Sequence, residues 1–352
     1  MHHKDPARLR RHLVTPRRCS VVSRRPSDSI TDDPEAGFGR PGKRSRPRTK
    51  DRPSYPNAAD ATVITVDRGR YRCLINNVGA VVTAMKARSL GRTAVIVGDR
   101  VRLAGDSSGD EGTLARIVEV NERETVLRRT ADDDDPFERP IVANADQLVI
   151  VAALADPPPR VGMIDRILVA AYDAGLEPLL VLTKSDLAAP DGLMATYRPL
   201  GIQVVAVEPG SDLSELRTAL AGHRSVLVGH SGVGKSTLVN ALIPGIDRMV
   251  GEVNEVTGRG RHTSSSAIAL MLPEDAGWVI DTPGVRSFGL SHVTPDSIIS
   301  AFSDLAEIVQ DCPRGCHHDS TAPECALDRA VADGRLAVER LESFRRMEKA
   351  FG

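Results

Sequence analysis

A glycine-rich segment with a lysine and two hydroxyl side chains has the residue types needed for phosphate binding. An apolar run (226–228) precedes it and a helical pattern (238–242) follows it, as a phosphate-binding loop requires. Lys235 would reach the β- and γ-phosphates, and the Ser236 hydroxyl would bind Mg²⁺. The alternative is a glycine-rich turn that matches by chance. The segment predicts nucleoside triphosphate binding by Gly229, His230, Ser231, Gly232, Val233, Gly234, Lys235, Ser236 and Thr237.

A second polar motif, Asp281–Gly284, follows the strand-like run Trp278–Ile280. A carboxylate at a strand end can hold the water shell of Mg²⁺, and the Gly284 N–H can sense the γ-phosphate. Taken alone, the motif could equally be a plain Pro-Gly turn. Because a phosphate-loop motif lies upstream, we predict that Asp281 and Gly284 contact the nucleotide.

A third motif, Thr183, Lys184, Ser185 and Asp186, follows the apolar run 178–182. A carboxylate here can accept hydrogen bonds from N1–H and the 2-amino group of guanine, whereas adenine would leave it unpaired. Lys184 would lie along the base plane, and Thr183 would brace the phosphate loop. The alternative is a helix N-cap by Ser185 or Asp186. Beside the other two motifs, this one favours guanine over adenine.

A cysteine and histidine cluster near the C-terminus has the spacing of a metal site. Cys312, Cys316, His318 and Cys325 form the pattern C-x3-C-x-H-x6-C, and His317 competes with His318 as the nitrogen ligand. Three thiolates and one imidazole make a closed tetrahedral zinc site, which is structural because no position remains for water. The alternative is a set of reduced surface cysteines in a reducing cytosol.

The chain as a whole, 352 residues with a net charge of −1, is long enough for two or three domains. It has no apolar stretch that could span a bilayer and no secretory signal, so we expect a cytoplasmic protein without membrane contact. Residues 1–57 are rich in Arg, Lys and Pro and are expected to be a disordered basic tail. This tail would contact nucleic-acid phosphates, or it is a solvated extension or the product of a start codon placed too early.

Five short apolar runs within residues 58–130 predict an all-β barrel of the OB type, a fold that often binds oligonucleotides. The runs are 62–66, 70–75, 80–84, 94–97 with 101–103, and 113–120. Tyr71 is their only aromatic residue, so an RNA contact would depend on phosphates and on salt. The alternative is a structural barrel with a basic surface. The positive charge comes from Arg68, Arg70, Arg72, Lys86, Arg88, Arg92, Arg100 and Arg102.

The remaining chain divides into a linker, an α/β domain and a C-terminal region. Residues 131–139, with four consecutive aspartates, are interpreted as an acidic linker. Residues 140–290 alternate buried strands and helices, which predicts a mainly parallel sheet with ligands at the carboxyl ends of the strands. Residues 291–352 form a small, mainly helical zinc-binding domain that ends in an amphipathic helix, 336–350, with Leu341, Phe344 and Met347 on one face.

The order of the motifs is unusual, because the guanine motif at Asp186 comes before the phosphate loop at Gly229. Most GTPases of this type run in the opposite order, so the elements are cyclically permuted. Over residues 58–352 the chain resembles the circularly permuted, ribosome-small-subunit-dependent GTPase A family (RsgA, also called YjeQ). The resemblance implies a permuted P-loop GTPase between a barrel and a zinc region, and we expect a monomer.

The resemblance also assigns roles to the switch segments. Residues 258–263 resemble the family's switch I, in which Thr263 would bind Mg²⁺ and the γ-phosphate, with Ser264 as the competing candidate. Val285 stands where related enzymes place a water-orienting glutamine, so intrinsic hydrolysis is expected to be slow. His262 matches a histidine that is a candidate for that role, or it is an exposed loop residue. The family's Ser-Ala guanine motif is not evident at 206–208, where no base contact is assigned.

The resemblance implies a GTP hydrolase that the small (30S) ribosomal subunit stimulates, that binds rRNA, and that acts late in subunit maturation. Release of the switch loops after hydrolysis would pass through residues 291–300 to the zinc region. One alternative is an RNA-binding regulator in which GTP is only a conformational ligand. A second is a phosphate-loop kinase, which would leave the motifs at Asp281 and Asp186 without roles.

Overall fold

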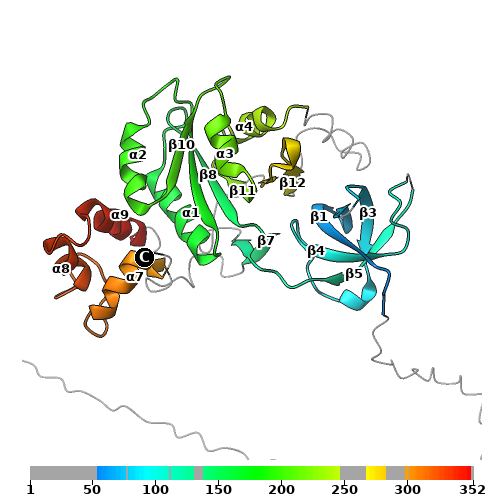
Figure 1. The fold of residues 1–352 in the computed structure, drawn as a ribbon, viewed down its shortest axis with the longest axis horizontal. Coiled ribbons are helices and arrows are strands. Elements are labelled where there is room, and N and C mark those ends of the chain that lie inside the picture. The colour runs from blue at the N-terminus through cyan, green and yellow to red at the C-terminus, as the bar shows by residue number, and fades with distance from the viewer. Residues whose placement is uncertain are drawn as a thin grey trace, which may run out of the picture. The chain divides into compact units, whose positions relative to one another are not determined.

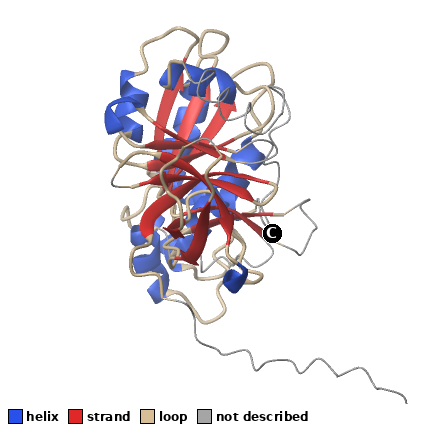
Figure 2. Cartoon of the chain, turned by 90° about the vertical axis from the view of Figure 1, so that its right-hand side faces the viewer, coloured by secondary structure: helices blue, strands red, loops and turns tan. Residues whose placement is uncertain are grey.

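The computed structural model describes residues 54–76, 78–110, 112–130, 138–245, 267–282, 298–300 and 302–349. Figure 1 traces these residues along the chain, and Figure 2 distinguishes their helices, strands and loops by colour. Within these ranges, no helix combines the length and the apolar composition needed to cross a bilayer. Expectations for residues 1–53, including the basic tail, lie outside this description.

A closed five-stranded barrel begins the described chain. Its strands pair in the order β1-β2-β3-β5-β4 and back to β1, with β3 and β5 parallel and the other pairs antiparallel. Inward residues such as Val63, Cys73 and Ile117 fill its core. This confirms the predicted OB-type barrel. The strands are β1 (Ala59–Asp67), β2 (Arg70–Ile75), β3 (Val81–Lys86), β4 (Arg100–Ala104) and β5 (Ala115–Val120).

The predicted run 94–97 is not a strand of the barrel. Only Val97 bridges to another segment, and its partner is Val142 in β7 (Arg139–Ala143). β7 pairs with β6 (Val126–Arg129), so two strands that the sequence did not predict flank the acidic run. Residues 131–137 of the predicted linker lie outside the described residues, and the domain limits stay predictions.

Gly98 marks a close approach between the barrel and the segment that enters the α/β sheet. Its φ is +87°, and a Cβ placed there would overlap the Ala143 carbonyl oxygen. The buried Asn144 side chain donates to the Gly98 carbonyl (2.9 Å) and accepts from the Glu124 N–H (2.9 Å). The close packing therefore requires glycine at position 98.

We predict that Gly98→Ala destabilises the protein more than Gly105→Ala does. Both glycines have a left-handed φ, which costs a residue with a Cβ about 1–3 kcal/mol, but only Gly98 faces a backbone oxygen. The clash should add about 1–3 kcal/mol, as overpacking does. Urea unfolding of the two variants measures the difference. If Gly98→Ala and Gly105→Ala lowered the free energy of unfolding equally, the contact between position 98 and the Ala143 carbonyl would not contribute to the difference.

The α/β part confirms the predicted mainly parallel sheet. Its strand order is β10-β9-β8-β11-β13-β12, in which only β12 runs antiparallel to its neighbour. A single residue pair, Thr65 and Ile268, continues the sheet into β1 of the barrel. The strands are β8 (Gln147–Ala153), β9 (Glu177–Thr183), β10 (Gln203–Val207), β11 (Arg224–Val228), β12 (Ile268–Met271) and β13 (Trp278–Asp281).

Alternate residues of the buried strands point to opposite faces of this sheet, as the two-residue period requires. Leu148 and Ile150 pack on the same side as α1 (Val161–Asp173), whereas Val149 and Val151 pack on the side of α3 (Ser214–Leu220) and α4 (Lys235–Leu242). The sheet is thus the middle of three layers. Between β9 and β10 lie α2 (Asp191–Tyr197) and the short helix η2 (Arg198–Leu200).

The C-terminal helices share the hydrophobic core on the α1 side of the sheet. They are α7 (Ser303–Ile308), α8 (Ala326–Ala332) and α9 (Val338–Glu348). The predicted amphipathic helix is α9, and its apolar residues Leu341, Phe344 and Met347 are buried there, as expected. The Arg340 guanidinium donates to the Pro199 carbonyl of η2 (2.8 Å), and Ser343 donates to the Thr196 carbonyl of α2 (3.1 Å). Helix α9 is therefore fixed directly to the α/β part.

Candidate functional site

The predicted phosphate loop connects β11 to α4. At Gly229 a Cβ would overlap the Val151 carbonyl oxygen, so the chain can leave β11 there only as glycine. Gly234, with φ +94°, precedes the first residue of α4. The positive end of the α4 dipole and the backbone N–H groups of the loop are therefore available for an anion at the carboxyl end of β11. Strand, loop and helix occur as the sequence predicted.

The Lys235 side chain contacts the phosphate loop, and Asp281, the last residue of β13, lies near enough to affect its pKa. Its ammonium group donates to the Gly229 carbonyl and to the His230 carbonyl (3.1 Å). Burial lowers the pKa of Lys235, and the nearby Asp281 carboxylate opposes that shift. Burial raises the pKa of Asp281, and Lys235 opposes it in turn. A partly buried cation and a partly buried carboxylate thus lie near each other at the site of the predicted phosphates.

The Asp281 carboxylate also has an unused hydrogen-bonding capacity. Its Oδ1 atom is buried and has no hydrogen-bond partner within the described part of the chain. The next residue is fixed, because the Thr282 hydroxyl donates to the Leu227 carbonyl of β11 (2.7 Å). A buried carboxylate oxygen beside a phosphate loop is an acceptor that the water shell of Mg²⁺ could satisfy. The residues present therefore fit this ion.

Thr183, at the end of β9, contacts the phosphate loop directly. Its hydroxyl donates to the Val233 carbonyl (2.6 Å), and its side chain lies 3.7 Å from where a Cβ at Gly234 would be. This is the brace expected from the sequence. The next residue, Lys184, has a left-handed backbone (φ +61°), and its ammonium group donates to the Asp156 carbonyl. The third motif and the phosphate loop thus lie side by side, although they are far apart in the sequence.

A cavity of about 350 Å³ opens between the third motif, the phosphate loop and the loop that follows β10. Thr183, Lys184 and Thr237 of the predicted site line it. Ser185 donates its N–H to the Val207 carbonyl (3.3 Å), and Asp186 is exposed. The sequence did not assign the β10 loop, which lines the cavity with Val207, Glu208, Pro209, Gly210, Ser211, Asp212 and Leu213. The signal that could have found it is its position after a buried parallel strand.

Several predicted residues lie outside the described part of the structure. They are the two switch I candidates His262 and Thr263, the competing Ser264, and Gly284 and Val285 of the motif after β13. Ser231, Gly232 and Ser236 are described; Ser231 and Ser236 are exposed on the phosphate loop and at the start of α4. The described site therefore contains the phosphate loop, Asp281 and the third motif.

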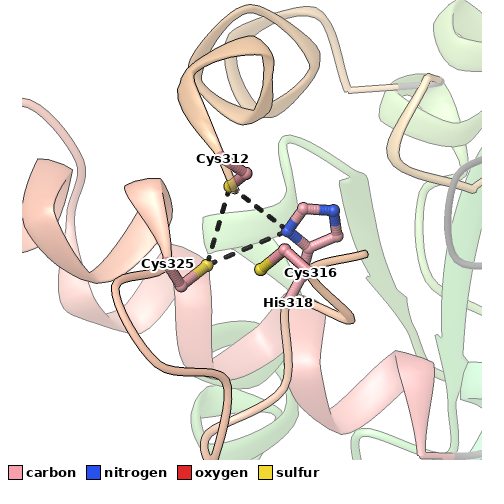
Figure 3. A group of neighbouring side chains, drawn as sticks. All are labelled: Cys312, Cys316, His318 and Cys325. Carbon is pink, nitrogen blue, oxygen red and sulfur yellow. Dashed lines mark hydrogen bonds between the residues drawn. The ribbon is translucent and has the colours of Figure 1, made fainter. Parts of the chain in front are cut away.

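The four predicted metal ligands come together in the C-terminal region (Figure 3). The His318 Nδ1 atom lies 3.6 Å from the Cys312 sulfur and 3.8 Å from the Cys325 sulfur, and the two sulfurs are 4.0 Å apart. One ligand atom from each of Cys312, Cys316, His318 and Cys325 lies within 4.8 Å of the others. Tetrahedral zinc with bonds of about 2.0–2.3 Å needs separations of this size. His318, rather than His317, belongs to this set.

Known proteins are similar to this chain in sequence and in fold. A family model described as RsgA GTPase matches residues 120–291. The small ribosomal subunit biogenesis GTPase RsgA of Pseudomonas aeruginosa is 41% identical over 261 residues, which are 72% of this chain and 74% of that protein. The protein of the same name from Azotobacter vinelandii is 40% identical over the same shares.

Solved structures agree with this relationship. YjeQ from Thermotoga maritima has a TM-score of 0.63 and 26% identity, and the match covers 84% of this chain and 98% of that one. YloQ, described as a circularly permuted GTPase, shares the fold with a TM-score of 0.62 over 84% of this chain and 96% of its own. The motif order, the phosphate loop and these comparisons lead to one conclusion: the chain belongs to the RsgA GTPase family.

Proposed function

We propose that this GTP-hydrolysing enzyme acts in late maturation of the small ribosomal subunit, and that the subunit stimulates its turnover. The observation that carries the nucleotide part is the phosphate loop with Lys235 and Asp281 at one end and a cavity at the other. The ribosomal part rests on the names of the relatives, which are small ribosomal subunit biogenesis GTPases. The rival is an RNA-binding regulator in which GTP is only a conformational ligand.

The phosphate end of the site assigns a task to each residue. Lys235 would leave the loop carbonyls and bind the β- and γ-phosphates, where it neutralises the charge that develops during transfer. Ser236 and Thr263 would bind Mg²⁺ directly, and Asp281 would hold its water shell. When bound, this ion would neutralise phosphate charge. Gly284 would sense the γ-phosphate, and His262 would position the attacking water.

The cavity between Lys184 and the β10 loop would hold the guanine base. Its volume and its place beside the phosphate loop suit a purine. Asp186 would turn toward the base and accept from N1–H and the 2-amino group, while the stem of Lys184 covers one face of the ring. The kinase alternative gives these residues no role.

We predict that Asp186→Asn reduces the preference for GTP over ATP by roughly 10- to 100-fold. The amide replaces one acceptor oxygen with a donor, which would oppose a donor on guanine. Competition of GTP and ATP against a fluorescent GDP measures the preference. Asp191→Asn is the matched control, because Asp191 is also an exposed aspartate but lies at the start of α2. An unchanged preference in Asp186→Asn would refute the guanine assignment.

The barrel would bind rRNA through its phosphates. Among the predicted cations, Arg100 pairs with Glu124, and Arg102 pairs with Glu119 and Asp60. Four others are exposed and form no ion pair with the described residues: Arg68, Arg70, Arg88 and Arg92. If one of these four arginines binds a phosphate, replacing it should reduce the slope of log RNA affinity against log salt concentration by about one.

The second cofactor would be one structural Zn²⁺ at the cysteine and histidine cluster.

A further inference from the structure

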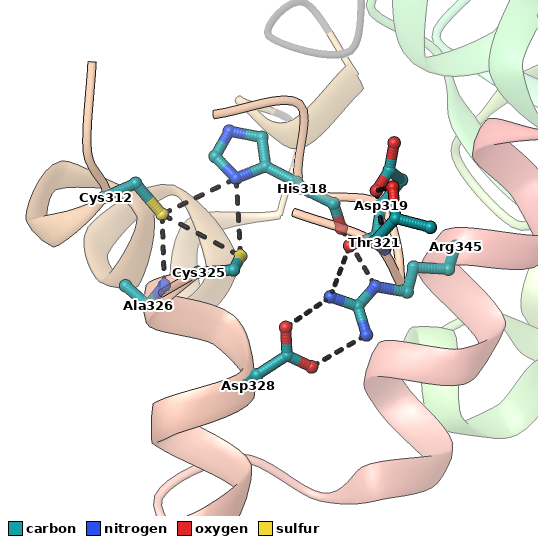
Figure 4. A network of polar contacts seen from close by, with 8 residues as sticks. All are labelled: Cys312, His318, Asp319, Thr321, Cys325, Ala326, Asp328 and Arg345. Atoms are coloured by element: carbon teal, nitrogen blue, oxygen red, sulfur yellow. Dashed lines mark hydrogen bonds and ion pairs between the residues drawn. The ribbon is translucent and has the colours of Figure 1, made fainter. Parts of the chain in front are cut away.

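Arg345 of α9 contacts the segment that carries the predicted zinc ligands, although it is not one of them (Figure 4). Its Nε donates to the His318 carbonyl (2.9 Å), and one terminal nitrogen donates to the Asp319 carbonyl (3.0 Å). The two terminal nitrogens also bind both carboxylate oxygens of Asp328 in α8, at 2.8 and 2.7 Å. A single guanidinium thus joins three segments of the C-terminal region.

The guanidinium at the centre of this hydrogen-bond network is mostly shielded from water, whereas the Asp328 side chain is 48% exposed. The Arg345 side chain is only 15% exposed, and its pairing with Asp328 raises its pKa further above the ordinary value. A bidentate guanidinium–carboxylate pair fixes both distance and orientation, which a single point charge does not. The network is therefore a rigid link rather than a loose surface ion pair.

The link acts on the backbone of a ligand that is held in an uncommon conformation. His318 has φ +61°, in the left-handed region, which a histidine adopts at a cost in free energy. The Arg345 guanidinium binds the carbonyl of that same residue and of the next one. These two hydrogen bonds favour the conformation that directs the imidazole toward the three sulfurs.

The link reaches the opposite side of the cluster through α8. Helix α8 begins directly after Cys325, and Asp328 lies in its first turn. The Ala326 N–H of the same turn donates to the Cys312 sulfur (3.3 Å). Arg345 therefore sets the distance between the His318 segment and the helix that follows Cys325. Its own helix is held by Arg346, which binds Asp165 of α1 (3.2 Å) and lies over the Tyr197 ring.

We propose that Arg345 is a positioning residue of the metal site, which holds His318 and Cys325 at coordination distance before the metal binds. Outer groups that orient metal ligands contribute about 10- to 100-fold to metal affinity. The proposal rests on the zinc ion proposed for this cluster. The two hypotheses fail in different ways. If the wild-type protein binds no zinc, the zinc site itself is refuted; if the wild type binds zinc and the Arg345 variant binds it equally well, only the role of Arg345 is refuted.

The experiment measures zinc affinity of the full chain by competition with a chromophoric chelator. Arg345→Met should bind zinc about 10- to 100-fold more weakly than wild type, and its cobalt complex should show an altered absorption spectrum in the visible region. Arg340→Met is the matched control: Arg340 is also in α9 and also pairs bidentately, with Asp304, but its hydrogen bonds go to no residue of the zinc segment. The control should bind zinc as wild type does.

Two results would overturn the proposal. One is wild-type zinc affinity in a folded Arg345→Met, and the other is an equal decrease of affinity in Arg340→Met. If Arg345→Met does not fold, Arg345→Lys carries the test, because lysine keeps the charge but cannot reproduce the four hydrogen bonds. A folded Arg345→Lys should then show weakened zinc binding, and unchanged binding in that variant would equally refute the role.

Discussion

Replacing Lys235 with alanine is expected to reduce GTP turnover by about 10²–10³-fold, the usual effect of removing one preorganised group that stabilises transition-state charge. The reason lies in the described site. Lys235 is the cation beside the phosphate loop, it is partly buried, and its pKa responds to the nearby Asp281 carboxylate. No other lysine donates a hydrogen bond to that loop within the described residues, so the missing charge would not be replaced.

Release of phosphate under saturating GTP measures this effect. Lys349→Ala is the matched control, because Lys349 is exposed at the end of α9, away from the loop, and should leave turnover unchanged. Folding of both variants is compared by thermal unfolding. If Lys235→Ala hydrolysed GTP at the wild-type rate, the phosphate loop would not be the site of hydrolysis.

Removal of the zinc ion is expected to unfold the C-terminal region. Structural zinc contributes about 10–16 kcal/mol of apparent binding free energy in small zinc domains, and here that energy would stabilise α7, α8 and α9. Cys325 is 1% exposed, so Cys325→Ser would both remove a ligand and leave a buried hydroxyl among the remaining thiolates. The zinc content should fall from about one ion per chain to near zero.

Elemental analysis gives the zinc content, and hydrogen exchange over residues 302–349 reports the unfolding. Cys73→Ala is the matched control, because Cys73 is also a buried cysteine but lies in the barrel core. It should keep the zinc and the slow exchange of the C-terminal helices. Retention of zinc by Cys325→Ser would exclude Cys325 as a ligand.

The sequence predicted the barrel, the sheet and the order of the motifs because each depends on local patterns. The two-residue period marks the barrel strands, and continuous apolar runs mark the buried strands of the sheet. It did not predict β6 and β7, since Val126–Arg129 is short and its partner follows the aspartate run. β6 and β7 pair across the aspartate run that separates them in the sequence. A local residue pattern contains no information on such a pairing.

The candidate site was predictable to the extent that it consists of motifs. The metal ligands and the phosphate loop are contiguous or closely spaced, so residue type and spacing were sufficient. The β10 loop and Arg345 were not assigned, because their roles depend on which strands are neighbours and on where α9 packs. The structure also shows that α9 contacts α2 and η2, whereas residues 291–297 of the predicted lever lie outside the described chain.

The proposed activation of this enzyme by the small ribosomal subunit is tested by measuring GTP turnover with and without purified small subunits. The measurement is made at low salt, with large subunits and Lys235→Ala as controls. We expect strong stimulation by small subunits, none by large subunits, and none in Lys235→Ala. Tight GTP binding without stimulation by small subunits would contradict the claim and favour a regulator for which GTP is only a conformational ligand.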